Sequence, residues 1–447
     1  STTDGAASAG AYANTIDGAN LGDVSIGGVG SLPGSANFAG SASSSNVGDE
    51  AGDISGAVSQ LKGIDGLEAT AGLNVASDAG ISGLAAVDLG SSAESTSGGY
   101  AIASAQAGTL QGAQLGATDI GGVGSVAGET SLTSGAASSN VTGQAISLSQ
   151  LNTAEGLEQT GALDVKSDAS VQGLANVSSS ADAATTAGAA TANALSGTIN
   201  GADLAAGNLD IGGIGSIAGQ ANFGLSATSS NVSDPSTATA DSAEATGLIG
   251  TETDDNDTTN TTEDDIFGID VASDSGLSGM AIGSLTADAS STAGSATATA
   301  GADDSAIGAV LPSLNVGGIS DLTGAAQLDS SATASNVGGF GKNAQAYAGQ
   351  ELGVTGLTVG TEAVFEADLY QTQESFAEEN GVDELTISAP TFNDSFNINV
   401  ASDSNITAQG FNNLDATASS TAGKATAAAG YTNAANAEVI GIASDMD

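Results

Sequence analysis

Apolar and small polar residues alternate along much of this chain with a period of two. Between Ala221 and Thr228, for example, Ala, Phe and Leu alternate with Asn, Gly, Ser and Thr. A period of two is typical of β-strands with one buried face, whereas a buried helix face recurs about every 3.6 residues. Alanine favours helices, but here it is dispersed among Gly, Ser and Thr. The pattern therefore predicts an all-β protein.

Two kinds of repeat unit alternate along the chain. The A unit opens with a Gly-rich apolar motif and reaches a Ser-Asn-Val turn 20 residues later in all four copies, from Ile26 to Asn46, Ile120 to Asn140, Ile211 to Asn231 and Val316 to Asn336. The B unit opens with Val-x-Ser-Asp and reaches a turn glycine 23 residues later, from Val75 to Gly98, Val165 to Gly188, Val271 to Gly294 and Val400 to Gly423.

The distance between units varies at one place only. B openings precede the next A opening by 40 to 46 residues, whereas A openings precede the next B opening by 45 to 84. Fixed spacing inside a unit and free length at one edge are typical of stacked repeats, whose insertions map to one face. We expect the insertions to follow the Ser-Asn-Val turn.

Each unit holds three predicted strands: a short Gly-rich strand, a long strand to the turn and a returning strand. A tandem-repeat β-solenoid with one unit per coil accommodates them; its eight coils would rise roughly 40 Å. Serial antiparallel three-stranded β-meanders are the alternative. Alanine offers little apolar area for burial, so a single unit needs its neighbours, and this favours the solenoid.

The units define the expected organisation of the chain. It comprises an N-terminal half-unit with an orphan returning strand (1–25), four A-plus-B repeats (26–119, 120–210, 211–315 and 316–438) and the start of an incomplete unit (439–447). Repeat 3 carries an acidic insertion (251–265) and repeat 4 an aromatic-rich insertion (about 341–395).

Composition excludes most chemistry. The chain has 447 residues, a net charge of −48, four lysines and no Arg, His, Cys or Trp. It therefore lacks the usual proton shuttle, thiol nucleophile and bidentate phosphate clamp. We expect no enzyme and no catalytic residue. The charge opposes nucleic-acid binding, and no segment is suited to span a membrane as a helix.

Four aspartates recur at the B openings, and stacking would align them. Calcium binds several oxygens and favours carboxylates, so the sequence suggests a possible calcium site at Asp78, Asp168, Asp274 and Asp403, although no cofactor is required. The alternative is that each aspartate bonds its own backbone in a turn.

The insertions suggest two further features. The acidic residues of 251–265 lack the spacing of an EF-hand and indicate a solvated loop. In the second insertion, the apolar residues of 363–379 lie near helical spacing, and Phe365, Tyr370 and Phe376 form either a partner-binding patch or a small local core.

The two ends of the chain suggest assembly. Residues 1–21 match a returning strand, and Val439–Ser444 match an opening strand. Unpaired strand edges are templates for another chain. We therefore expect a homopolymer built head-to-tail, with an assembly interface at Thr15, Ile16, Leu21, Val439, Ile440 and Ile442.

The sequence thus predicts the subunit of a self-assembling extracellular filament or matrix. A calcium-rigidified adhesin stalk or surface-layer protein is the alternative, and a polysaccharide-binding or polysaccharide-cleaving solenoid is a remote one. The chain starts at Ser1 rather than Met, as after signal-peptide removal, so we expect a secreted or cell-surface location.

Overall fold

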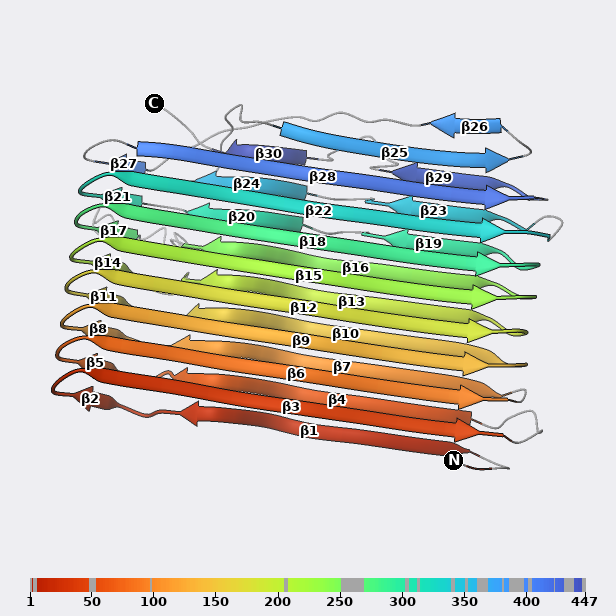
Figure 1. The fold of residues 1–447 in the computed structure, drawn as a ribbon, viewed down its shortest axis with the longest axis horizontal. Coiled ribbons are helices and arrows are strands. Elements are labelled where there is room, and N and C mark those ends of the chain that lie inside the picture. The colour runs from red at the N-terminus through yellow and green to blue at the C-terminus, as the bar shows by residue number, and fades with distance from the viewer. Residues whose placement is uncertain are drawn as a thin grey trace, which may run out of the picture.

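The protein is a stack of parallel β-strands in three sheets (Figure 1). The computed structural model describes residues 2, 6–47, 54–96, 99–204, 208–250, 269–301, 305–311, 314–338, 342–349, 353–359, 369–379, 382–385, 398–400, 404–421, 423–429 and 438–443. These residues contain strands and turns and no helix.

Sheet 1 contains the returning strands. They are β1 (Ala7–Asn20), β4 (Ile54–Ala69), β7 (Tyr100–Leu115), β10 (Gln144–Gln159), β13 (Ala190–Asp203), β16 (Ser236–Ile249), then the paired half-strands β19 (Ala296–Ala300) with β20 (Ser305–Leu311), β23 (Ala344–Ala348) with β24 (Gly353–Val359), and β29 (Ala425–Ala429) with β30 (Glu438–Ala443).

Sheet 2 contains eight three-residue strands. They are β2 (Val24–Ile26), β5 (Leu73–Val75), β8 (Thr118–Ile120), β11 (Leu163–Val165), β14 (Leu209–Ile211), β17 (Ile269–Val271), β21 (Leu314–Val316) and β27 (Ile398–Val400).

Sheet 3 contains eight 17-residue strands and two shorter ones at one end. The long strands are β3 (Gly30–Asn46), β6 (Ala79–Ser95), β9 (Gly124–Asn140), β12 (Ala169–Thr185), β15 (Gly215–Asn231), β18 (Ser275–Ser291), β22 (Ser320–Asn336) and β28 (Ser404–Ser420); the short ones are β25 (Leu369–Glu379) and β26 (Val382–Leu385).

The chain passes through sheet 1, sheet 2 and sheet 3 in turn, so three strands make one coil. Neighbouring coils pair in parallel and in register: Val165 lies between Ile120 and Ile211, and Val177 between Leu132 and Phe223. This confirms the predicted all-β solenoid. Parallel pairing rules out the antiparallel meanders, whose strands would pair within a unit. Below, A coils and B coils are those that carry the A and B motifs.

Two local predictions differ from the structure. The paired glycines of the A motif lie in the turn after the short strand rather than in a strand. The insertions also lie elsewhere: residues 250–268 separate β16 from β17, and 360–397 separate β24 from β27. Length is therefore added mainly between sheets 1 and 2. The acidic stretch 251–265 lies outside the described residues.

The aromatic-rich insertion is shorter than predicted, and its described part is extended. Its first residues form β23 and β24 in their ordinary places in sheet 1. Leu369–Glu379 is strand β25, so the helical spacing was misleading there. β25 pairs in parallel with β28, and β26 turns back antiparallel to β25 (Figure 1).

The segment near the C-terminus also differs from its predicted place. β30 pairs with β24 in sheet 1, where Val354 faces Val439 and Leu357 faces Ile442. It therefore continues the returning-strand sheet and does not open a further copy of sheet 2.

A ladder of glycines holds sheets 1 and 3 close together. Every coil has a glycine at the same place in sheet 1, as at Gly156 and Gly201, and seven of the eight long strands of sheet 3 have one opposite, as at Gly128 and Gly173. A Cβ on Gly128 would overlap the carbonyl oxygen of Gly156, and a Cβ on Gly173 that of Gly201. The sheets therefore meet backbone to backbone along a line that we call the waist.

The waist divides the interior into two cores. On the side of sheet 2 the core is Leu, Ile and Val from all three sheets, including Leu157, Val165 and Val171. On the other side it is largely Ala between sheets 1 and 3. The alanine core is thin enough for hydroxyls to cross it: Ser59 Oγ donates to Gly90 O at 2.5 Å, and Ser91 Oγ to Ala57 O at 2.6 Å.

Adding one methyl group to the waist should destabilise the fold. Gly219→Ala in β15 would place a Cβ against Gly247 O, whereas Gly224→Ala in the same strand has no atom within 4 Å of its Cβ. Overpacking typically costs about 1–3 kcal/mol. Urea denaturation should show this loss for Gly219→Ala and almost none for Gly224→Ala; equal midpoints would contradict the waist.

Candidate functional site: corner aspartates and sheet edges

The three B-motif aspartates in the described residues each join their B coil to the next A coil. Asp168 Oδ1 accepts the backbone N–H of Ile214 at 2.9 Å. Asp78 and Asp274 do the same for the equivalent residues, Val123 and Ile319, each at 2.9 Å. The alternative prediction was that each aspartate bonds the backbone of its own turn. The structure shows that each bonds a turn in the following coil instead.

The paired glycines of the A motif make room for this contact. A Cβ on Gly213 would overlap Asp168 Oδ1, and a Cβ on Gly122 would overlap Asp78 Oδ1. The Gly-Gly pair and the Ser-Asp pair are therefore two halves of one inter-coil joint. The sequence displays both motifs, but the contact between them is visible only after stacking.

The predicted calcium aspartates are not brought together. Asp78, Asp168 and Asp274 lie in alternate coils, with an A coil between each pair, so their backbones are roughly 9.6 Å apart. One carboxylate oxygen of each already accepts a backbone N–H of the next coil. Asp403 lies outside the described residues. Within the described part of the chain, no group of three or more acidic side chains is arranged to hold a metal ion.

Another set of aspartates does stack on consecutive coils. The central residue of each short strand faces outward, and four neighbouring strands place Asp119, Asp164, Asp210 and Asp270 in register. We call this set the aspartate ladder. Its signal was present in the sequence, because each aspartate directly precedes the apolar residue that opens a unit.

The aspartate ladder concentrates negative charge. Burial, followed by the charges of Asp164 and Asp270, raises the pKa of Asp210, and Lys166 opposes this shift. Lys166 forms an ion pair with Asp164, and this hydrogen bond is the main reason that the lysine pKa is raised. Asp119 and Asp164 also line a groove of about 480 Å³ beside Asn74 and Thr118.

A second acidic strip runs along the outer face of sheet 1. Gln111 Nε2 donates to Glu155 at 3.0 Å and to Glu158 at 2.5 Å. Burial raises the pKa of Glu155, and Glu158 adds to the shift. Burial, with the charges of Asp17, Glu68 and Glu158, raises the pKa of Asp65 to about 6.

The asparagines of the Ser-Asn-Val turns close the opposite corner. Asn140 Oδ1 accepts the N–H groups of Thr142 and Gly143 at 3.2 and 3.1 Å, and its Nδ2 donates to Gly99 O of the preceding coil at 2.8 Å. B coils use a hydroxyl instead: Thr185 Oγ1 donates to Gly143 O at 2.7 Å. Both corners therefore alternate with a period of two coils.

The predicted assembly residues lie on strands at the two ends of sheet 1. Thr15 and Ile16 belong to β1, whose strand pairing within the described residues is with β4 alone, and Leu21 N donates to Glu68 O at 2.8 Å. Ile16 is only partly buried, whereas Ile64, its counterpart one coil inward, is fully buried. Val439, Ile440 and Ile442 lie on β30 at the other end of the sheet.

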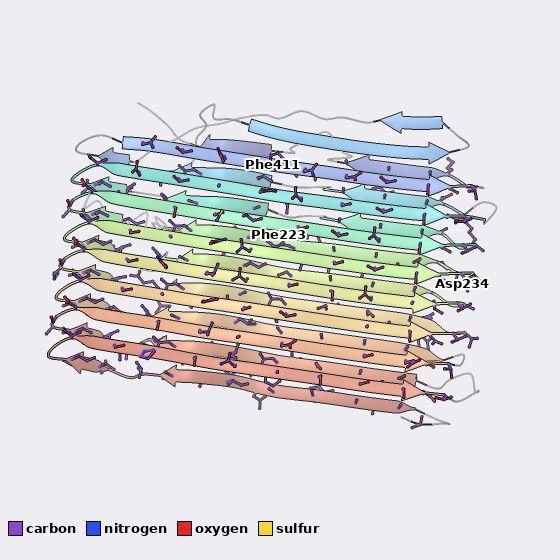
Figure 2. The ribbon with its side chains drawn as sticks, viewed as in Figure 1. Phe223, Asp234 and Phe411 are labelled. Carbon is purple, nitrogen blue, oxygen red and sulfur yellow. The ribbon has the colours of Figure 1, made fainter. Side chains whose placement is uncertain are left out.

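The predicted aromatic patch is only partly described. Tyr370 and Phe376 lie on β25, with the backbone of Tyr370 in register with Phe411 of β28, which Figure 2 labels. Phe365 lies outside the described residues.

No family model, curated protein or solved structure matches this chain. In the described part of the chain, no helix has the length and hydrophobicity needed to cross a membrane.

Removing one corner aspartate should loosen one joint. Asp168→Ala removes the acceptor of the Ile214 N–H, a loss of about 0.5–1.5 kcal/mol because this exposed group can bond water instead. Hydrogen exchange should show faster exchange at Ile214, whereas Asp168→Asn, which keeps an acceptor oxygen, should retain most of the protection. Unchanged exchange in Asp168→Ala would refute the joint.

Asp65 should make the fold more stable in mild acid. Because its pKa is raised from 3.8 to about 6, the folded state binds this proton more tightly than the unfolded chain does. The resulting stability is present below about pH 4 and is lost as the pH rises through 6. The denaturation midpoint should fall between pH 4.5 and 7.5, and Asp65→Asn should reduce that fall. Asp88→Asn, an exposed control, should leave it unchanged.

Proposed function

We propose that this protein is a structural subunit that polymerises head-to-tail through the edges of sheet 1, forming an extracellular filament or matrix. In this proposal, β1 of one copy pairs with β29 and β30 of another and extends the same parallel sheet. Heterologous contacts of this kind build open filaments, and backbone pairing at a sheet edge supplies the attraction.

The observation that carries the proposal is a contrast between the ends of sheets 1 and 3. Natural proteins blunt exposed edges with proline, charge or a covering segment. Sheet 3 is blunted at both ends, by Pro33 within β3 and by the antiparallel strand β26 beyond β25. Among the described residues, sheet 1 has neither device at its end strands: β1 and β30 contain no proline and one acidic residue each.

The covering strands also correct one expectation about the ends. Sequence reasoning expected both ends to be uncapped, whereas β25 and β26 extend sheet 3 beyond β28. Because β25 and β26 cover the end of sheet 3, the open edge at the β30 end consists of sheets 1 and 2.

The net charge and the absence of Arg and His fit a structural role. A charge of −48 keeps free subunits apart and soluble, so the edges have to pair by backbone hydrogen bonds at an ionic strength that screens repulsion.

A calcium-stiffened stalk or surface-layer protein is the second candidate function. The aspartate ladder favours it: the carboxylates of neighbouring strands, whose backbones lie about 4.8 Å apart, repel one another, and the buried Asp164 Oδ1 has no hydrogen-bond partner. An ion between consecutive rungs would relieve that repulsion. If the folded structure becomes more ordered with calcium and no filaments form, the result favours this function over the first.

Blocking either edge should stop polymerisation. Successive N–H groups of a strand point in opposite directions, so either Ala11→Pro or Tyr12→Pro removes a donor from the open side of β1. Val439→Pro and Ile440→Pro do the same for β30. Negative-stain electron microscopy, with and without millimolar calcium, should show filaments for the parent chain and none for the effective variant of each pair.

Mixing the blocked variants tests the polarity. A chain blocked at β1 still has a free β30 edge, and a chain blocked at β30 has a free β1 edge. Their mixture should give dimers in analytical ultracentrifugation, whereas each alone should stay monomeric with unchanged circular dichroism. A parent chain that remains monomeric in both buffers refutes the proposal.

A further inference from the structure

A row of β-branched side chains runs along the corner between sheets 3 and 1. Each is the residue directly after a long strand of sheet 3, and we call the row the ridge: Val47, Thr96, Val141, Thr186, Val232, Thr292, Val337 and Thr421. Valine comes from A coils and threonine from B coils. Asp234, labelled in Figure 2, lies at this corner of the stack.

The valines of the ridge are unusually exposed, and the ridge itself is uncharged. Val141 and Val232 are each 47% exposed, and Val337 is 61% exposed. The nearby carboxylate of Asp234 is occupied, because it accepts Gly188 N–H at 2.8 Å and the Ser233 hydroxyl at 3.1 Å. In a chain with 52 acidic residues, this row is a place where two copies could meet without like charges in contact.

The outer face of sheet 3 carries a groove that runs along the stack. Its volume is about 350 Å³, and it follows the waist, because the sheet bends inward at the glycines Gly34, Gly83, Gly128, Gly173 and Gly219. The side chains of its wall alternate like the ridge: Leu84 and Leu174 come from B coils, and Glu129 and Gln220 from A coils.

The ridge and the groove share one period. In each, an apolar side chain recurs every second coil, roughly every 9.6 Å, with a polar one between. When two copies lie side by side with an axial offset of one coil, the ridge valines that lie against the groove face Leu84 and Leu174, and the threonines between them face Glu129 or Gln220. A partner of a different fold would lack this spacing, whereas a second copy of the chain has it by construction.

We propose that the ridge of one copy docks in the groove of a second copy, so that the solenoids associate laterally with their axes aligned. This contact is separate from the end-to-end pairing proposed above: it uses a corner and a sheet face and leaves β1 and β30 free. It would convert single filaments into bundles.

The absence of cysteine makes cross-linking a clean test. Single-cysteine chains are mixed in the background blocked at β1, so that end-to-end assembly cannot contribute. Val141→Cys should form a disulfide heterodimer with Leu174→Cys, since a disulfide requires Cα atoms about 4.4–6.8 Å apart. Its yield should be several-fold higher than with Asp288→Cys, an exposed residue of the same sheet face away from the groove.

Phase and charge provide two further readouts. Glu129→Cys lies in the same groove but one coil out of phase, so its yield with Val141→Cys should be lower than that of Leu174→Cys. Raising the salt concentration should increase the Leu174 yield, because screening weakens repulsion between the acidic chains. Equal yields for Leu174→Cys and Asp288→Cys would overturn the proposal, and equal yields for Leu174→Cys and Glu129→Cys would overturn the proposed phase.

Discussion

The close approach of sheets 1 and 3 at the waist is the constraint on which the rest of the structure depends. Two backbones can lie in contact only where neither residue has a Cβ, and glycine is the residue that permits it. Because the waist is continuous, a bulky residue in one coil would force its neighbours apart as well. This explains why every coil keeps a glycine in sheet 1 at this place while its other positions vary.

The waist also sets the chemistry of the interior. On the side away from sheet 2 the interior is largely Ala, and hydroxyls such as that of Ser59 reach backbone carbonyls across the gap. Farther toward sheet 2 the cross-section widens, and Leu, Ile and Val fill it. A chain with few large apolar residues thus obtains a well-packed interior by narrowing the space that has to be filled.

Much of the fold could be predicted from the sequence because stacking imposes local regularity. The fixed offsets from Ile26 to Asn46 and from Val75 to Gly98 marked the long strands and their corners, and the period of two marked the buried faces. The waist was harder to foresee, since glycine is common throughout the chain and opposing glycines such as Gly128 and Gly156 lie 28 residues apart. The corner aspartates were recognised, but their acceptor role was not, because Asp168 bonds a residue 46 positions away.

The aspartate ladder was missed for a different reason. Asp119, Asp164, Asp210 and Asp270 belong to both kinds of unit, so a motif defined within A units or within B units does not contain the whole set. In sheet 2 the short strands of A and B coils occupy equivalent positions, and the set appears only when all coils are aligned. The extended conformation of β25 could not be predicted from the pattern either. Apolar spacing near 3.6 residues can arise by chance in a short strand that pairs with a neighbouring strand.

Because the two kinds of corner alternate, the evolution of this protein is restricted to changes that keep them alternating. An Asp corner fits against a Gly-Gly corner, and loss of a single coil would place two corners of the same kind in contact. Gene duplication or deletion should therefore preserve the stack only when it adds or removes coils in pairs. The length of such a solenoid would change in steps of about two coils, much as a coding sequence tolerates insertions only in multiples of its codon.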